Sequence, residues 1–488
     1  MADRTAADTE LPPGPGKHPM KLLGVGPTWI REDPTGVMTH LRDEYGPTFR
    51  VYNPVVGGES YVLGRPEQVQ YVLNDAHDGF AKAEIYEDEL GDVFGKGLVT
   101  SEGDLWKRQR SLIAPMFTRE RIAGFVELMV EETLAMVDRW RDVADAGETI
   151  DLLEEMERVT LLTIGRAMFG ADMAGKVDEM QWALDVLRGR FKRRTEYMVK
   201  VPDWMPTPLN LRDQRAFETL EEIVREIIAS RDPADAAARV EGSDGGAGHD
   251  GTGHGGASAD DADLLDMLLA AETGDGEGMD EDQVRDEVMT FLLAGHETTA
   301  ASLTWTWYLL AHAPERYEAL HDAVADVEVP DGADVTAVAR ALQDVRPYVQ
   351  EAMRIFPPVP LFARRATEEH VVDGYRVPEG ANVVLPQIVT HRDPGIWDEP
   401  WRYDPDRFRG DGIDDKPDYS YYPFGGGPRM CIGRMFSLVE SQVILGLTSR
   451  DLRLALESPT HPPEEMPVRT AVTMTPDTPI EMSVEEWT

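Results

Sequence analysis

The sequence predicts a mainly α-helical protein with a small β-sheet portion. Helical patterns fill four segments in the first half of the chain and one long segment after its middle: 119–146, 151–169, 175–200, 212–231 and 280–312. The β-rich runs are short and lie beside glycine turns: 49–52 and 60–63 around Gly57 and Gly58, and 374–385. Helix therefore dominates the expected fold, and a further helix is expected to begin near Pro66.

The chain is strongly acidic. It has 48 Lys and Arg against 90 Asp and Glu, a net charge of −42 over 488 residues, and its hydrophobic share of 42% is enough for a substantial core. Phosphate binding needs clustered cations, so this charge disfavours nucleic acid as a partner, and it disfavours anionic membrane surfaces too. Self-repulsion of this size destabilises a compact protein unless salt screens it, which favours a high-salt cytoplasm such as that of halophilic archaea.

The ends of the chain and its composition suggest a single domain. Residues 1–20 form an acidic and proline-rich N-terminal segment without the order of a secretory signal, and 21–488 form one domain. Residues 241–263 mix Gly, Asp, Ser and His with almost no large apolar residue, so they are expected to be a disordered insertion. No window approaches roughly 18 uninterrupted apolar residues, so we expect a cytoplasmic protein without a membrane anchor.

Residues 80–103 and the segment after them offer a first candidate site. The first stretch has several glycines and no sustained period, so it is expected to be a long surface loop. Trp106 and Arg110 follow, one helical turn apart. An ordinary amphipathic helix explains this pair. The same two residues can also donate an indole N–H and a guanidinium to one anionic group.

The only cysteine of the chain lies in an unusual loop. Residues 424–433 contain three glycines and a proline before Cys431 and another glycine after it, so the backbone can approach a bulky group closely. The helical pattern that follows places the thiol where a helix begins, which favours the thiolate. Phe424 can cover the sulfur and keep water from it. A buried structural cysteine in a glycine turn is the alternative.

This loop resembles the haem-thiolate loop of the cytochrome P450 family. The resemblance implies the cytochrome P450 fold for 21–488, haem b as cofactor, Cys431 as the axial ligand of the iron, and contacts of Phe424 and Gly425 with the cofactor. Thiolate ligation pushes electron density onto iron and favours cleavage of the O–O bond.

The middle of the long helix carries a second pattern of the same family. Ala294, Gly295, His296, Glu297, Thr298 and Thr299 follow one another there. Gly295 is a poor choice for helix stability and is expected to make room for a ligand or water. Ala294 and Thr298 share a small, flat face that suits a porphyrin. The resemblance implies that Thr298 and Glu297 are catalytic and deliver protons to bound dioxygen.

The resemblance also assigns further residues. It implies that Trp106, Arg110, Arg364 and Arg429 bind the haem propionates, with Arg365 as an adjacent rival of Arg364. It places Phe291, Ala294, Val359, Leu361 and Phe362 at the substrate. It makes Glu351, Arg354 and Arg407 a buried structural triad that supports the cysteine loop, although an acid and an arginine at this spacing are also a common surface pair.

Together these motifs predict a haem-thiolate monooxygenase that inserts one oxygen atom of O2 into an apolar organic substrate. No nicotinamide-binding or flavin-binding domain is evident, so electrons are expected from a separate partner, an acidic ferredoxin with its reductase, docking at Lys107, Arg108 and Arg434. The alternatives are a peroxide-driven oxygenase or a haem-thiolate isomerase, and a non-catalytic haem sensor or carrier.

Overall fold

The computed structural model describes residues 10–14, 34–53, 58–196, 202, 204–244, 262–272, 279–329, 335–457, 461–470 and 473–487. Its α-helices are α2 (Pro34–Tyr45), α3 (Pro66–Gln70), α4 (Glu84–Phe94), α5 (Gly103–Ile113), α6 (Arg119–Gly124), α7 (Val126–Ala146), α8 (Leu152–Phe169), α9 (Val177–Glu196), α10 (Pro208–Ala229), α11 (Pro233–Asp244), α12 (Leu264–Glu272), α13 (Glu281–Ala311), α14 (Pro314–Val324), α15 (Val335–Ala341), α16 (Arg346–Ile355), α17 (Gln387–Thr390) and α18 (Arg434–Asp451).

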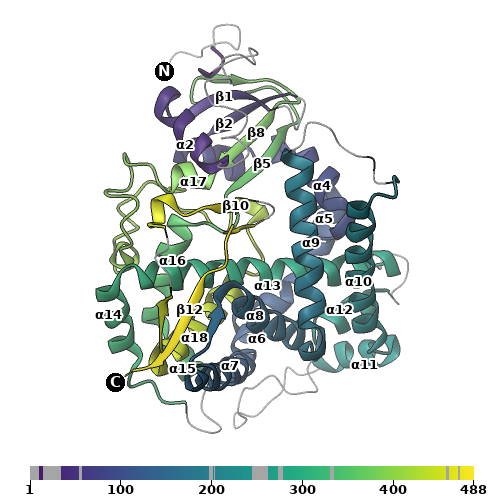
Figure 1. The fold of residues 1–488 in the computed structure, drawn as a ribbon. Helices are drawn as coiled ribbons and strands as arrows, with labels where there is room; N and C mark the ends of the chain where they lie inside the picture. The colour runs from purple at the N-terminus through teal and green to yellow at the C-terminus, as the bar shows by residue number, and fades with distance from the viewer. Residues whose placement is uncertain are drawn as a thin grey trace.

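The strands are short and form small sheets, as expected. They are β1 (Thr48–Asn53), β2 (Gly58–Leu63), β3 (Phe80–Lys82), β4 (Thr149–Asp151), β5 (Leu361–Ala366), β6 (His370–Val372), β7 (Tyr375–Val377), β8 (Asn382–Pro386), β9 (Leu452–Leu456), β10 (Val468–Thr470), β11 (Met474–Pro476) and β12 (Glu481–Glu486). A five-stranded sheet in the order β1-β2-β8-β5-β3 lies at one end of the molecule (Figure 1). The predicted β1–β2 hairpin is confirmed, with Thr48 opposite Leu63.

The long helix α13 crosses the middle of the molecule (Figure 1). It has 31 residues, and the Asp280 side chain caps its first turn by accepting a hydrogen bond of 2.8 Å from the Gln283 N–H. Pro314, which has no N–H to continue the ladder, starts the next helix. Most side chains of α13 are buried around its whole circumference, because α8, α10, α16 and α18 all pack against it. The predicted helix is confirmed, and it is the central element of the core.

The expected surface loop at residues 80–103 is wrong for much of its length. Residues 80–82 form β3, which pairs with β5, and residues 84–94 form α4. Leu90 and Phe94 of α4 are buried, and Tyr86 packs against the core beside them. These residues recur at the i, i+4, i+8 spacing of an amphipathic helix, a pattern that the neighbouring glycines had obscured.

Three further expectations need adjustment. The helix at 119–146 is interrupted at Phe125, which separates α6 from α7. Of the expected disordered insertion, residues 241–244 belong to α11 and Ala262 and Asp263 precede α12, whereas 245–261 lie outside the described residues. Of the N-terminal segment only 10–14 is described; there the Pro13 carbonyl accepts a hydrogen bond of 2.8 Å from the Arg50 N–H of β1.

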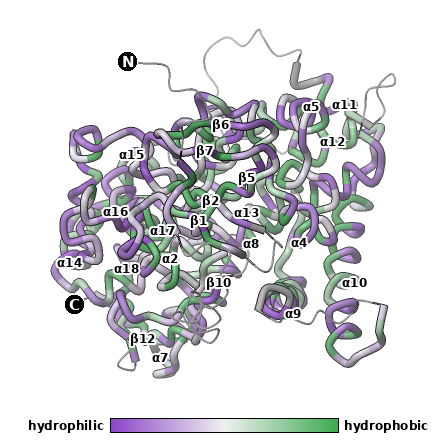
Figure 2. Tube along the Cα trace, turned by 90° about the horizontal axis from the view of Figure 1, so that it is seen from above, coloured by the Kyte–Doolittle hydropathy of each residue, from purple (hydrophilic) through white to green (hydrophobic). Residues whose placement is uncertain are grey.

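Helices α9 and α10 pack against each other at one margin of the molecule, away from α14 and α16 (Figure 2). Within the described ranges, no helix combines the length and the apolar composition that crossing a bilayer requires.

Candidate functional site

The Cys431 loop is held in a tight turn just before α18. The Cys431 N–H donates to the Phe424 carbonyl at 2.9 Å, which closes the loop. Gly425 and Gly427 have φ values of +71° and +62°, and a Cβ on Gly427 would lie 1.9 Å from the Leu73 carbonyl oxygen. Only glycine fits such a position, so the loop depends on the residues that the sequence singled out.

The thiol of Cys431 is accessible although protein surrounds the loop. Burial raises the pKa of the free thiol above its ordinary value, while backbone N–H groups of Gly433 and Arg434 and the charge of Arg110 act in the opposite direction. The backbone N–H groups at the start of α18 therefore lower the pKa of the thiol, as expected. Burial raises the pKa by more, so the net effect on the free thiol is an increase.

Trp106 lies within contact distance of two guanidinium groups. Arg110, one turn later on α5, has its Cζ 5.9 Å from the centre of the Trp106 ring, and Arg429 of the cysteine loop has its Cζ 5.6 Å from the same centre. Arg429 also donates to the Phe80 carbonyl at 2.8 Å and to Glu102 at 2.7 Å. The structure thus brings three of the four expected propionate-binding residues together.

Arg364 and its rival Arg365 point to opposite faces of β5, as neighbours in a strand must. Arg364 is buried, hydrogen-bonds to Tyr86 and lies near Arg429, and burial lowers its pKa. Arg365 is 43% exposed and pairs with Glu84 at 3.5 Å. Arg364 is therefore on the side of Arg429, and Arg365 is on the surface side.

Two residues of this region, Lys82 and Glu102, were not predicted from the sequence. Lys82 of β3 is largely buried near Arg364 and Arg429, donates to the Leu98 and Ser101 carbonyls at 3.0 and 2.8 Å, and has its pKa lowered to about 7, mainly by burial. Glu102 accepts hydrogen bonds from both Arg429 and the Lys82 N–H. Neither stands in a recognisable motif, because β3 was hidden in the expected loop.

In the middle of α13, the Thr298 hydroxyl donates to the Ala294 carbonyl at 3.0 Å. Both residues are half-buried, and the hydroxyl oxygen keeps lone pairs for a further donor. The expected role of Gly295 is wrong: a Cβ there would lie 2.9 Å from Ile164 of α8, so this glycine permits close packing of two helices. His296 is buried, and its Nδ1 lies 2.6 Å from the Leu292 carbonyl oxygen, so its ring is not directed at the candidate site.

The next residue ties the long helix to the helix after Cys431. The Thr299 hydroxyl of α13 donates to the Ser437 hydroxyl of α18 at 3.0 Å. Thr299 follows Thr298 directly, and Ser437 is the fourth residue of the helix that begins after the cysteine loop. The two parts of the chain that the motifs marked are therefore in direct contact.

Glu297 belongs to a buried ionic network. Arg188 of α9 donates to it at 3.0 Å, and the Thr473 hydroxyl donates to it at 2.6 Å. Burial raises the pKa of Glu297, but the Arg188 charge and the Thr473 hydrogen bond prevail and hold it below its ordinary value. Arg188 also contacts Glu157 of α8, whose pKa burial raises to about 7. Arg188, Glu157 and Thr473 could not be predicted from a local pattern, because they are far from Glu297 in the chain.

The expected substrate residues come from two elements. Phe291 of α13 is buried and stacks on Phe117, with ring centres 5.7 Å apart. Val359 precedes β5 and Leu361 starts it, and both are half-buried, as is Phe362. A Cβ on Gly425 would lie 3.4 Å from the Phe362 ring, so this part of β5 borders the cysteine loop.

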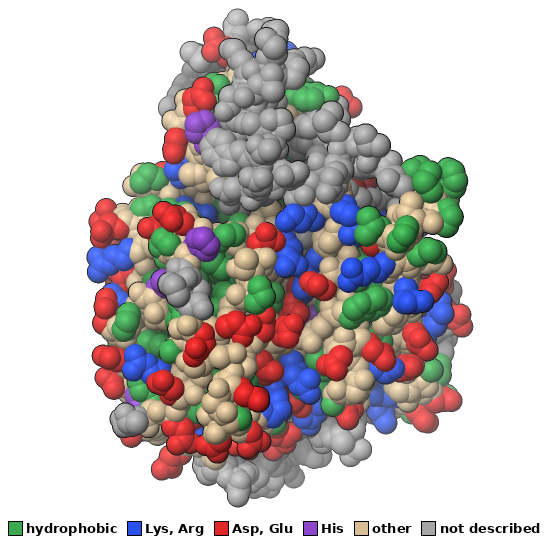
Figure 3. Space-filling model, in the orientation of Figure 1, with side chains coloured by type: hydrophobic (Ala, Val, Ile, Leu, Met, Phe, Trp, Pro, Cys, Tyr) green, Lys and Arg blue, Asp and Glu red, His purple; other side chains and the backbone are tan. Residues whose placement is uncertain are grey.

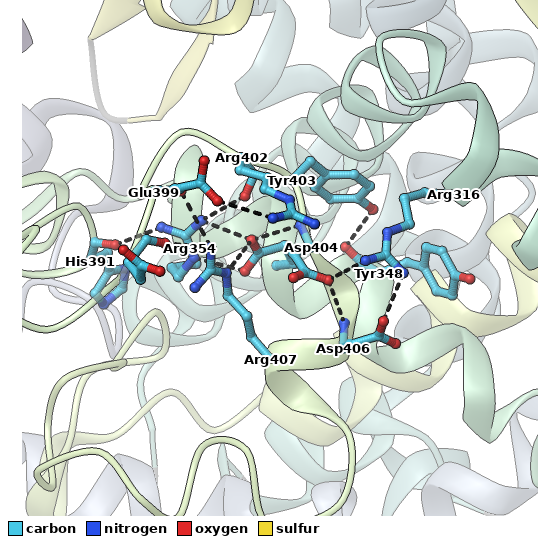
Figure 4. A network of polar contacts seen from close by, with 12 residues as sticks. Arg316, Tyr348, Arg354, His391, Glu399, Arg402, Tyr403, Asp404, Asp406 and Arg407 are labelled. Atoms are coloured by element: carbon cyan, nitrogen blue, oxygen red, sulfur yellow. Dashed lines mark hydrogen bonds and ion pairs between the residues drawn. The ribbon is translucent and has the colours of Figure 1, made fainter.

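Glu351 and Arg354 lie together in the core, and the partly exposed Arg407 contacts Glu351 from outside it. Arg354 donates to both carboxylate oxygens of Glu351 at 2.7 and 2.8 Å, and neither side chain is exposed. Arg407 lies 3.4 Å from the same carboxylate. Figure 4 shows Arg354 and Arg407 in a network that reaches Arg316 through Asp404 and Asp406. Arg354 also donates to the His391 carbonyl, which ties α16 to the chain that leads into the cysteine loop.

The donor set fits haem. One accessible thiol, an indole and several buried cations with few acids among them suit an iron ligand and two propionates. Within the described part of the chain, no cluster of three or more His, Cys, Asp or Glu could hold a bare metal ion. The glycines of the cysteine loop let its backbone pack closely against Phe362, Tyr419 and Leu73, which fixes the position of Cys431.

Comparisons with known proteins agree with this fit. The chain is 34% identical over 394 residues to cyclooctatin synthase of Streptomyces melanosporofaciens, covering 79% of this chain and 78% of the relative. It is 30% identical over 401 residues to cyclooctat-9-en-7-ol 5-monooxygenase of the same organism, covering 81% and 80%. The crystal structure of the cytochrome P450DA heme domain matches in fold, with a TM-score of 0.79, 24% identity and 98% of each chain covered.

The sequence profile of the Cytochrome P450 family matches residues 12–484, nearly the whole chain. Relatives at 29% and 30% identity are named as a hydroxylase and a monooxygenase. The protein belongs to the cytochrome P450 family, and it is a haem-thiolate monooxygenase whose cofactor is haem b.

Proposed function

We propose that this P450 hydroxylates an apolar substrate, with Cys431 as the iron ligand, Thr298 and Glu297 handling protons, and a ferredoxin supplying electrons. The observation that carries the proposal is the contact between α13 and α18. The hydroxyl of Thr299, which follows Thr298 on α13, donates at 3.0 Å to Ser437 of α18, the helix that follows Cys431. It supports a site in which the proton-handling residues face the group held by the cysteine.

Haem held by the Cys431 thiolate supplies the reductive activation of dioxygen. Trp106, Arg110, Arg364 and Arg429 bind its propionates; the buried position of Arg364 favours it over Arg365. Lys82 adds a further cation. Their shared task is to fix the orientation of the cofactor in the site.

Thr298 and Glu297 hold and move protons. The Thr298 hydroxyl, oriented by its bond to the Ala294 carbonyl, accepts a hydrogen bond from a reacting hydroxyl or water on the Ala294 face. Glu297 is ionised at neutral pH, because Arg188 and Thr473 hold its pKa low. Once it has left Arg188, the Glu297 carboxylate accepts a proton supplied by bulk solvent and passes that proton on to Thr298. Until then the ion pair with Arg188 holds Glu297 away from the reacting group.

The substrate is an apolar molecule, such as a terpenoid, fatty acid or steroid. Phe291, Val359, Leu361 and Ala294 offer it an apolar surface. The relative named cyclooctat-9-en-7-ol 5-monooxygenase has an alkenol as its substrate, which favours a terpenoid-like compound of low polarity. Relative affinity is measurable as a shift of the Soret band when candidate lipids are added.

The electron donor is an acidic ferredoxin. Arg434 opens α18 beside the cysteine, and Arg346 lies near enough that its pKa is lowered by burial and by the Arg434 charge. Lys107 is exposed, whereas Arg108 reaches Gln283 of α13. Arg346 therefore joins Lys107, Arg108 and Arg434 as a candidate cation of the docking face. Reversing their charges is expected to slow reduction.

The acidic surface suits a high-salt cytoplasm. With 90 acids against 48 cations, the free energy of unfolding is expected to rise with salt, since screening reduces self-repulsion. The comparisons give no support to an archaeal source, so only the adaptation to salt is proposed. Melting temperatures that do not depend on salt would contradict it.

The substitution Thr298→Ala tests the proposed chemistry. Substrate binding should be retained, while electrons consumed from a reductase and ferredoxin system yield more hydrogen peroxide and less hydroxylated product. Product yield per electron that equals the wild-type value contradicts the role of Thr298. Driving the wild type with hydrogen peroxide in place of the reductase system separates the proposal from a peroxide-driven oxygenase.

A further inference from the structure

Glu157 of α8 is a buried acid to which the proposed function assigns no task. Its carboxylate contacts the guanidinium of Arg188, which is buried as well. Most acids of this chain are placed differently: Asp and Glu side chains cover much of the face that Figure 3 draws, where water solvates them. Glu157 lacks that access, so its charged form depends on Arg188.

The guanidinium of Arg188 is shared between acids. Its Nε lies 3.0 Å from Oε1 of Glu297, its Nη2 contacts Glu157, and its Nη1 lies 4.0 Å from Oδ1 of Asp185. Asp185 is 64% exposed and pairs with Arg469 of β10 at 3.2 Å, so it counts for little inside the core. One buried cation therefore serves two buried carboxylates, Glu157 and Glu297.

Helix α8 fixes Glu157 beside α13. One turn after Glu157, the Thr160 hydroxyl lies 3.2 Å from the carbonyl oxygen of His296. One turn further, Ile164 packs against Gly295 so closely that a Cβ on that glycine would lie 2.9 Å from it. Glu157 therefore stands on an element that is anchored to the long helix, and Arg188 keeps a partner there when the Glu297 side chain moves.

The charges with the largest effect on Glu157 come from α9 and α13, although α7, α12 and β4 also pack against α8. Burial raises the pKa of Glu157 to about 7, the Arg188 charge lowers it, and the charges of Glu297 and Asp185 raise it. His296 stands next to Glu297, and burial lowers the pKa of this histidine below its ordinary value. The imidazole is therefore neutral at neutral pH, and the balance of charge rests on the two carboxylates and Arg188.

Protonation of Glu297 removes one of the two negative charges that can balance Arg188. A buried guanidinium without a counter-charge is strongly destabilising. We infer that Glu157 is the positioning residue that makes this step possible: its ionised carboxylate holds Arg188 when Glu297 leaves, so Glu297 can carry a proton without stranding a charge in the core. The proton that Glu157 itself gives up goes to bulk solvent. The inference rests on the proposed role of Glu297 in moving protons.

The state of Glu157 decides whether Glu297 is free to leave. Below about pH 7 Glu157 holds its proton, and Glu297 is then the buried anion that Arg188 needs. Above about pH 7 Glu157 is ionised and takes Arg188 over. Proton delivery by Glu297 should therefore become faster as the pH rises through this value.

The first test is turnover of the full-length, haem-loaded protein with reductase and ferredoxin in excess. The substrate is lauric acid, farnesol or progesterone, whichever shifts the Soret band most. Glu154→Gln is the matched control, because it removes an exposed acid one turn earlier on the same helix. The rate of product formation in Glu157→Gln, divided by the rate in this control, should fall roughly tenfold from about pH 6 to about pH 8. The reason is that the ionised fraction of Glu157 rises from about one tenth to about nine tenths over this range.

A merely structural partner of Arg188 gives a different result. Its removal would lower the melting temperature and leave the ratio of rates independent of pH. Soret spectra and melting temperatures of both variants are compared with those of the wild type, so that unfolding is not mistaken for a lost proton transfer.

The second test needs no turnover and no substrate. Infrared difference spectra between acidic and alkaline samples of the resting protein detect carboxyl groups that lose a proton. One carboxyl should titrate near pH 7 in the wild type and in Glu154→Gln, and it should be missing from Glu157→Gln. In Glu297→Gln it should titrate at lower pH, because the Glu297 charge no longer raises the pKa of Glu157.

Two results overturn the inference. One is a ratio of rates that stays constant across the pH range, and the other is a carboxyl titration that Glu297→Gln leaves unchanged. Thr298→Ala and Glu297→Gln report separately on the proposed function. If these two variants keep the wild-type yield of product per electron, the proposed function fails. If they lose product while the ratio for Glu157→Gln stays constant, only the role of Glu157 fails.

Discussion

Arg188 Nε lies 3.0 Å from Glu297 Oε1, and the same guanidinium contacts Glu157 on its other side. One buried cation thus serves two carboxylates from two helices. Glu297 keeps a low pKa in this arrangement, whereas burial raises the pKa of Glu157 to about 7. The carboxylate beside Thr298 therefore stays ionised at neutral pH, and its neighbour is poised to gain or lose a proton.

Replacing Glu297 with Gln should lower the rate of product formation by about 10²–10⁴-fold, the usual contribution of a positioned acid or base. Substrate affinity, measured by the Soret shift, should change little. Thr473→Val is the matched partner: the carboxylate remains but loses one hydrogen bond that stabilises its charge. Its pKa should rise, so the acidic limb of the pH–rate profile should move to higher pH. An unmoved limb would count against Glu297.

Arg364→Gln should release haem faster than Arg365→Gln. Arg364 is buried beside Arg429, and a charge-assisted hydrogen bond to a propionate is worth enough to slow haem loss roughly tenfold or more. Arg365 pairs with Glu84 on the surface side, so its removal should change the loss rate little. The measurement is haem transfer to an apo-haem-protein acceptor. Equal rates in the two variants would refute the assignment of Arg364.

Arg354→Met should cost about 3–5 kcal/mol of unfolding free energy, because it strands the Glu351 carboxylate inside the core. Adding Glu351→Leu should restore part of that loss, since no buried charge is then left alone. Arg402→Gln breaks an ion pair whose partners are 58% and 63% exposed, so it should change the unfolding free energy little. Denaturant titration of the three variants decides between a buried triad and an ordinary surface pair.

Glu287→Gln should make stability less dependent on pH. Burial raises the pKa of Glu287 to about 8, and one of its oxygens has no hydrogen-bond partner among the described residues. The folded protein therefore holds a proton that the unfolded chain releases near its ordinary pKa of 4.5. Binding of this proton stabilises the folded wild type. The stabilisation is complete below pH 4.5, and it is lost as the pH rises through about 8.

The measurement is the melting temperature of wild type and variant across this range. Because Gln carries no proton to lose, the wild type should fall several degrees relative to the variant as pH rises. A constant difference between the two proteins would mean that Glu287 does not hold its proton in the fold.

The sequence predicted the parts of the site that depend on local chemistry. The Cys431 loop needs glycines because Gly425 and Gly427 have positive φ and a Cβ on Gly427 would meet the Leu73 backbone, so one continuous stretch of sequence predicts the loop. The long helix shows its ends through Asp280 and Pro314. Helix α4 was missed because its neighbouring glycines masked the spacing of Tyr86, Leu90 and Phe94.

Residues that meet only in the folded chain could not be predicted. Arg188 stands 109 positions before Glu297, and nothing local distinguishes it from other arginines of α9. Lys82 is identified only by its burial beside Arg364 and Arg429. Gly295 was expected to make room for a ligand. In the structure it instead allows close packing against Ile164, which belongs to another helix, α8.

The bond between Thr299 and Ser437 limits how the enzyme can adapt. It joins α13 to α18, so the two helices cannot separate at this point without breaking it. Room for a bulkier molecule is therefore expected to come from other elements, such as the turn before β5 that carries Val359. Laboratory selection for larger substrates should collect its changes there and leave the bond between Thr299 and Ser437 untouched.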